Sequence, residues 1–377
     1  MASCLQRPTL LLRPTLISSL LPTASASSAH VHFSLCAGLP LRASPSASSP
    51  APLHPAPTTT ASIRNPPASS TFPLIGRKSL SMAASAQSRT DIPNKESDKC
   101  FEIPSGKTPL EMIYLEGNSW LWTVNGLNIL VDPVLVGNLD FGIPFLYDAA
   151  KKSKLMKEFT LDDLPKLDCI LITQGYDDHC HKNTLTAMVE RFSEVRVIAS
   201  PNCEPIMGKI GYHNVTYLEP SDGTMLGDIR IRAIAGPVLG PPWQRPENGY
   251  FLEVPDPKFV LYYEPHCIFG KAGLENERAD VIVTPVNKQV LPAYTLVSGQ
   301  EDAVRLAKLL QPKFLVTMKN AELDSRGVLS LIVSEKGTVD TFKKMLAEDV
   351  PNCQVLEPEP GVPLEVPVLN VDRNSSN

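Results

Sequence analysis

The stretch at 171–179, LITQGYDDH, passes from apolar residues into a cluster of polar side chains. Residues 168–173 form a mostly apolar run, which is typical of a buried β-strand. Residues 183–192 then follow a helical pattern, and Asn183 is a suitable N-cap. The stretch is therefore predicted to lie where a strand ends and a helix begins.

Short runs typical of β-strands precede this stretch. Residues 110–115, 120–124 and 129–131 are rich in β-branched and aromatic residues. The dipeptide Asn125-Gly126 separates the second run from the third, and it is a strong signal for a tight hairpin turn. A β-rich beginning is therefore expected.

Strands and helices alternate through the rest of the chain. Helices are expected at 148–157, 300–310 and 338–346, and the Pro-rich segment 356–368 is expected to wrap the surface. Two halves that each combine a β-rich block with β–α alternation predict two stacked sheets with helices outside, in one domain at 108–368. The later strands are expected at 195–199, 215–218, 229–235, 250–254, 259–263, 281–285 and 314–318.

The stretch at 171–179 resembles the HxHxDH signature of the metallo-β-lactamase superfamily. Residues 128–133 (NILVDP) resemble the strand and turn upstream of that signature. Residues 259–266 (FVLYYEPH) and 314–320 (FLVTMKN) stand where the family has strand ends that carry further ligands. The resemblance covers 108–335, and it is greatest to the branch with sugar-phosphate lactonases and N-acyl-phosphatidylethanolamine phospholipases. It implies an α/β fold, a four-layer αββα sandwich.

The resemblance also implies a two-zinc site whose activated water attacks an ester, a lactone or a phosphodiester. The signature positions here read Gln174, Tyr176, Asp178 and His179, and the loop near 236–240 contains no histidine. The family's standard centre needs five histidines. Residues 91–377 contain only four, so that centre is excluded. The four are His179, His181, His213 and His266.

One interpretation is a rebuilt site for a single metal. Asp178, His179, Glu264 and His266 follow predicted strand ends on the face that the resemblance implies, and they are the candidate catalytic residues. These four side chains and His181 are the candidate metal ligands. Two or three histidines with one or two carboxylates suit Zn, Fe or Mn. The protein would then be a hydrolase of a small anionic ester, lactone or phosphodiester.

The other interpretation is a pocket without metal. Gln174, Tyr176, Lys319 and Arg245 would then line a polar site beside the same cluster, and Trp243 would contact the ligand from above. Lys319 stands where the family has a ligating histidine, so its ammonium would attract an anion. In such a pocket His179 or His266, beside a carboxylate, would act as a general acid–base. Alternatively, the protein would be a non-catalytic descendant that binds a small anionic metabolite, a lipid headgroup or a protein.

The chain begins with a basic leader. Seven arginines and lysines precede Asp91, the first acidic residue, among many Ser, Ala and Pro. This composition is typical of an organelle transit peptide, and 1–90 is predicted to direct import into the chloroplast stroma. A linker at 91–107 and a disordered tail at 369–377 are expected.

Without the leader, 28 Lys and Arg stand against 40 Asp and Glu, a formal charge of −12. This balance argues against nucleic acid as a partner. No apolar run approaches the roughly 20 residues that a membrane-spanning helix needs.

Overall fold

The computed structural model describes residues 101–102, 104–238, 244–292, 294–320 and 322–368. They belong to one compact unit of the chain, Thr90–Asn377. The predicted leader at 1–90, the tail at 369–377 and Trp243 lie outside the described residues. No helix among the described residues is long and apolar enough to cross a membrane.

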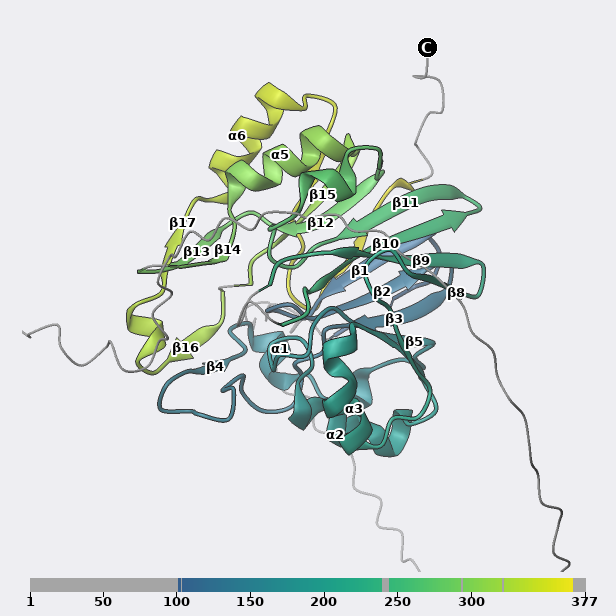
Figure 1. Ribbon diagram of the computed structural model, residues 1–377, viewed down its shortest axis with the longest axis vertical. Coiled ribbons are helices and arrows are strands. Elements are labelled where there is room, and N and C mark those ends of the chain that lie inside the picture. The colour runs from purple at the N-terminus through teal and green to yellow at the C-terminus, as the bar shows by residue number, and fades with distance from the viewer. Residues whose placement is uncertain (1–100, 103, 239–243, 293, 321, 369–377) are drawn as a thin grey trace, which may run out of the picture. The chain divides into compact units, whose positions relative to one another are not determined.

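The first large sheet is built mainly from the N-terminal half of the unit (Figure 1). The predicted hairpin at Asn125-Gly126 is confirmed: both residues have positive φ, and the flanking Val124 and Leu127 pair across the turn. In spatial order the strands are β19 (Pro363–Glu365), β1 (Leu110–Tyr114), β2 (Trp120–Val124), β3 (Leu127–Val131), β5 (Cys169–Ile172), β6 (Arg196–Ala199) and β7 (Val215–Tyr217).

The second large sheet is built mainly from the C-terminal half. Its middle strands are buried on both faces and are rich in Val, Ile, Tyr and Phe, as expected for strands between two layers. In spatial order they are β18 (Gln354–Leu356), β15 (Phe314–Met318), β12 (Val281–Pro285), β11 (Lys258–Tyr263), β10 (Asn248–Pro255), β9 (Ile229–Ala235) and β8 (Gly223–Leu226).

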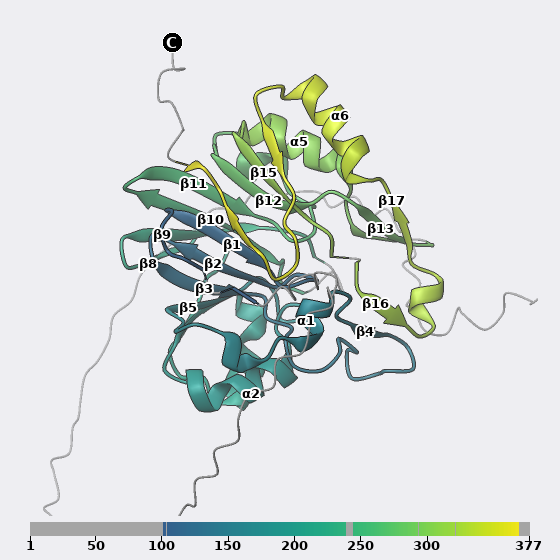
Figure 2. The same cartoon turned by 180° about the vertical axis from the view of Figure 1, so that it is seen from behind.

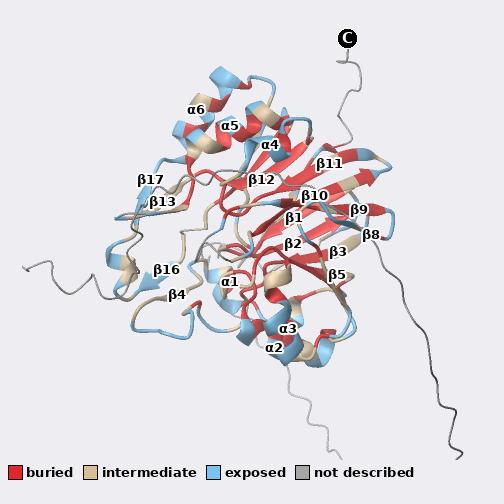
Figure 3. Cartoon of the chain, viewed as in Figure 1, coloured by how far each residue is buried: buried red, intermediate tan, exposed pale blue. Residues whose placement is uncertain are grey.

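Three apolar clusters define four layers. One cluster joins side chains of both sheets, including Trp122 and Tyr263, whose rings meet edge to face at 5.3 Å. The other two clusters lie between each sheet and its outer helices. The described residues therefore form the predicted αββα sandwich, with the middle strands of the two large sheets buried and the outer helix faces exposed (Figure 3). The helices are α1 (Lys154–Glu158), α2 (Lys182–Phe192), α3 (Glu204–Ile210), α4 (Lys271–Leu274), α5 (Gln300–Leu310) and α6 (Val339–Asp349), with 3₁₀ turns η1 (Leu161–Asp163), η2 (Pro201–Cys203) and η3 (Leu329–Leu331).

Two small sheets lie beside the sandwich (Figure 2). One contains β14 (Tyr294–Val297), β13 (Lys288–Leu291) and β17 (Ser334–Lys336). The other pairs β4 (Asp148–Ala150) with β16 (Asp324–Arg326). These strands were not predicted.

Two expectations were wrong. The helix expected at 148–157 is split: its first residues form β4, and only α1 is helical. The segment 356–368 does not wrap the surface, because β19 pairs with β1 and Val366 and Val368 are buried in the core. In both places, pairing with a distant strand overrides the local pattern.

Candidate functional site

Polar side chains gather where strands of both large sheets end. Asp132 follows β3, Glu264 follows β11 and Asn320 follows β15 by two residues, while His179 lies in the loop between β5 and α2. The β1–β2 turn supplies Asn118. Asn320 ties these loops together, because its amide donates to the Asn118 side chain and to the Pro265 carbonyl, each at 2.7 Å.

Asp132 holds His179 in a fixed orientation. One Asp132 oxygen accepts from the Thr173 backbone N–H at 2.8 Å, and the other accepts from the Thr173 and Tyr263 hydroxyls at 2.7 and 3.1 Å. His179 Nδ1 lies 2.9 Å from the same oxygen. A proton on Nδ1 completes this network and leaves Nε2 directed at the rest of the cluster.

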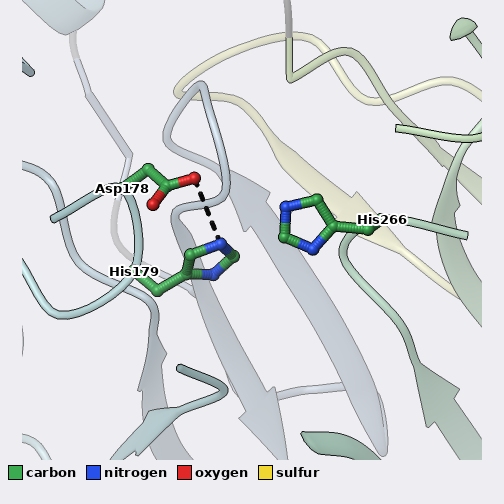
Figure 4. A group of neighbouring side chains, drawn as sticks. All are labelled: Asp178, His179 and His266. Carbon is green, nitrogen blue, oxygen red and sulfur yellow. Dashed lines mark ion pairs between the residues drawn. The ribbon is translucent and has the colours of Figure 1, made fainter. Parts of the chain in front are cut away.

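Asp178 lies on the other side of the His179 ring. Its Oδ2 is 3.3 Å from His179 Nε2, and the Asn118 amide nitrogen is 3.2 Å from the same ring atom. Burial alone would raise the pKa of Asp178, but the neighbouring His179 and His266 outweigh it and lower that pKa. Burial likewise opposes charge on His179, and Asp178 and Asp132 raise its pKa well above the ordinary value. Figure 4 shows Asp178, His179 and His266 pointing toward one another.

Glu247 completes the cluster, and it was missed in the sequence. Its side chain is fully buried, with Oε2 at 2.7 Å from His266 Nδ1 and 3.9 Å from His179 Nε2. Neither carboxylate oxygen receives a well-directed hydrogen bond from any described residue. The family resemblance places a histidine in the loop before β10. In this chain the group from that loop that reaches the site is instead the carboxylate of Glu247.

Glu264 is tied to the backbone beyond its own strand. Its two oxygens accept from the N–H groups of His266 and Ile268 at 3.2 and 3.0 Å. Burial, with the negative charge of Glu247 nearby, raises the pKa of Glu264 well above the ordinary value. Glu264 is therefore less readily ionised than an exposed glutamate.

The structure does not bring every candidate residue to this cluster. His181 lies just before α2, with Nδ1 at 2.8 Å from the Thr184 hydroxyl and Nε2 at 3.9 Å from Asp177, outside both groups of candidate ligand atoms. Burial lowers the pKa of His181. Gln174 is buried, and its side-chain oxygen has no partner among the described residues.

Of the remaining candidates, Tyr176 lines a cavity together with Asp178 and His266, whereas Lys319 and Arg245 do not line it. The Tyr176 hydroxyl donates to Gln244. Lys319 pairs with Glu322 at 3.4 Å, and the exposed Arg245 pairs with Glu219. Two of these side chains are therefore already engaged with carboxylates.

The cluster offers two overlapping groups of candidate metal ligands that share His266. Ligand atoms of Asp178, His179 and His266 lie within 4.8 Å of one another, and so do those of Glu247, Glu264 and His266. Two ligands bound to one ion at about 2.0–2.2 Å can be at most about 4.4 Å apart, so the cluster has nearly the required size. Two histidines cannot supply the five-histidine set.

A cavity of about 520 Å³ adjoins the cluster. Asp178 and His266 line it together with Asn118 and Asn320. Asp178 has a side chain that is 26 % exposed, while His179 and Glu247 are closed off behind it. A ligand in the cavity would therefore meet Asp178 and His266 first.

Comparison with known proteins agrees with this architecture. The model of the beta-lactamase superfamily domain matches residues 111–319, more than half of the chain. A possible metal-dependent hydrolase from Veillonella parvula superimposes with a TM-score of 0.51 at 13% identity, over 69% of this chain and 100% of that chain.

The isothiocyanate hydrolase from Delia radicum gut bacteria superimposes with a TM-score of 0.50 at 15% identity, over 67% of this chain and 98% of that chain. At such identities the structural likeness concerns the fold, while the match to the domain model covers the sequence itself. The chain belongs to the metallo-β-lactamase superfamily.

Proposed function

We propose that this protein is a metal-dependent hydrolase with a single divalent cation held by Asp178, His179, Glu247 and His266. The observation that carries the proposal is Glu247. A buried carboxylate whose oxygens lack well-directed donors is strongly unfavourable unless a cation compensates it. The described residues offer His266 Nδ1 at 2.7 Å, and a shared cation would serve both side chains.

The charges around the cluster also favour a cation. The carboxyl groups of four residues come together at the cluster: Asp132, Asp178, Glu247 and Glu264. Burial opposes charge on His179, but the neighbouring Asp178 and Asp132 raise its pKa. A divalent ion would bind the imidazole in its neutral form and would offset the negative charge of the carboxylates.

A bound divalent cation would polarise the scissile group and lower the pKa of a bound water. The chain's own residues do the rest. Asp132 fixes the His179 tautomer, so that Nε2 is the nitrogen offered to the site. Glu264 lies in the same group of candidate ligands as Glu247 and His266, and Asp178 faces the cavity where it can orient the attacking water. The reaction class is hydrolysis of an ester, lactone or phosphodiester bond.

The experiment is a metal titration of the chelator-treated protein with Zn²⁺, Mn²⁺ and Fe²⁺, read by bound metal per chain and by competition with a coloured chelator. We expect one equivalent to bind. Glu247→Ala and His266→Ala should each weaken binding by about tenfold or more, because each removes a direct ligand. His213→Ala is the matched control, since His213 is exposed. A metal affinity that is unchanged in both Glu247→Ala and His266→Ala would refute the proposal.

One contact favours the alternative, a non-catalytic binding protein. The Asn118 amide nitrogen lies 3.2 Å from His179 Nε2, where it can donate to the lone pair that a metal would need. On this alternative, Asn118→Ala leaves metal binding absent. On the proposed function, the same substitution leaves binding intact or strengthens it.

A further inference from the structure

The two small sheets supply part of the wall of the cavity beside the cluster. Leu291 on β13, Leu296 on β14 and Ala149 on β4 line it, and so does Leu329 on η3. The cavity therefore lies between the cluster at the strand ends and the segments beside the sandwich.

The lining of the cavity is unsuited to an anion. Its charged side chains are Glu116, Asp178 and Glu335 against one cation, Lys151. The Lys151 ammonium donates to the carbonyls of Leu115 and Glu116, so it is already committed to the protein. Away from the cation that the proposed function places at Asp178 and His266, the body of an anionic ligand would meet an excess of negative charge and would lose its hydration without compensation.

Apolar side chains form a large part of the lining on the small sheets and η3, together with a few polar residues. Among the lining residues, Phe141 is 45% exposed. Outside the lining, Val328 beside η3 donates its backbone N–H to the carbonyl of the exposed Phe145. Exposed large apolar side chains are found where apolar ligands or partners bind.

We infer that the cavity binds an uncharged amphiphile, with a carboxylic ester or lactone group at Asp178 and His266 and an alkyl or aryl body along Leu291, Leu296 and Leu329. The assignment of an ester or lactone group rests on the proposed function. The assignment of an apolar alkyl or aryl body rests on the cavity alone. Hydrolysis would break the acyl C–O bond, adding the hydroxyl of water to the acyl carbon and its proton to the leaving oxygen. The resulting carboxylic acid would release its proton to solvent, which leaves a carboxylate and an alcohol, both on one molecule when the substrate is a lactone. A volume of about 520 Å³ is ample for such a body.

The test uses binding, so that it is independent of activity. The uncharged dye Nile red is bound to the chelator-treated full chain and displaced by neutral alkan-2-ones from butan-2-one to dodecan-2-one. Each added methylene should tighten binding about threefold until the cavity is filled. Leu329→Trp should weaken dodecan-2-one binding about tenfold or more, by filling the cavity.

Leu331→Trp is the matched control, because Leu331 is on the same 3₁₀ turn, is 83% exposed and does not line the cavity. Leu291→Trp blocks the cavity from a different element, should Leu329→Trp fail to fold. Weakened binding in the cavity variants and wild-type binding in the control support the inference, even if the metal titration fails.

Affinity that is independent of chain length would overturn the inference. So would wild-type affinity in both cavity variants. Tighter displacement of the dye by inorganic phosphate than by dodecan-2-one would show an anion site and overturn it as well.

Discussion

Two carboxylates, Asp132 and Glu247, are equally buried in this protein but differ in their hydrogen bonds. Asp132 is 0% exposed and accepts hydrogen bonds from Thr173 and Tyr263, besides its contact with His179. Glu247 is also 0% exposed, yet neither oxygen has a well-directed donor among the described residues. The Asp132 carboxylate is therefore bonded within the folded protein, whereas the oxygens of Glu247 are available to a ligand such as a cation.

This contrast separates residues that build the site from residues that act in it. The Asp132 network joins β3, β5 and β11, so it connects the two sheets before any ligand arrives. Asp132 also has a positive φ of 41°, a conformation that costs on the order of 1–3 kcal/mol and persists only when surrounding contacts enforce it. Glu247 makes no such contribution to the scaffold.

The largest effect is expected at Asp132. Asp132→Ala should lower the free energy of unfolding by about 3–5 kcal/mol, because it leaves several buried donors without an acceptor. Urea unfolding of the chelator-treated protein measures this. Asp132→Asn is the matched control, since Asn tolerates positive φ and keeps one acceptor, and it should cost less. A loss under about 1 kcal/mol for the Ala variant would contradict the scaffold role.

Glu247 should behave in the opposite way. In chelator-treated protein, Glu247→Gln is expected to raise the free energy of unfolding by about 1–2 kcal/mol, because it removes a buried charge with no well-directed donor. Glu253→Gln on β10 is a suitable control, since Glu253 pairs with Arg232 at 3.1 Å and its loss should destabilise slightly. Destabilisation by Glu247→Gln would show instead that Glu247 and His266 form a structural ion pair.

The smallest of the three effects on the free energy of unfolding is expected at Lys151, and this effect depends on pH. Burial lowers the pKa of Lys151 to about 8, while Glu116 opposes the shift. Between pH 8 and the ordinary value near 10.4, the unfolded chain holds the proton and the folded chain has lost it, so stability should rise with pH.

Relative to Lys151→Met, the wild type should gain about 1 kcal/mol over that range, a figure reduced for partial exposure. Urea unfolding at a series of pH values tests this. A difference between the two proteins that stays constant from pH 7 to pH 10.5 would be inconsistent with the lowered pKa.

The αββα sandwich could be predicted because its signals are local. The apolar run before Asp178, the Asn125-Gly126 turn and the alternation of strands and helices depend on periodicity and turn chemistry, which short segments carry by themselves. Only four histidines lie at 91–377, so the family's five-histidine centre is ruled out if the predicted leader is removed. The import of residues 1–90 into the chloroplast stays a prediction.

The tertiary structure decided which polar residues meet. His181 is two residues from His179, but the turn before α2 directs it to Thr184, whereas Glu247 arrives from 68 residues away. The pairing of β4 with β16, and hence the cavity wall, depends on contacts between segments far apart in the chain. Sequence periodicity records which residues are buried; which buried charges face one another is set only when distant strands pack.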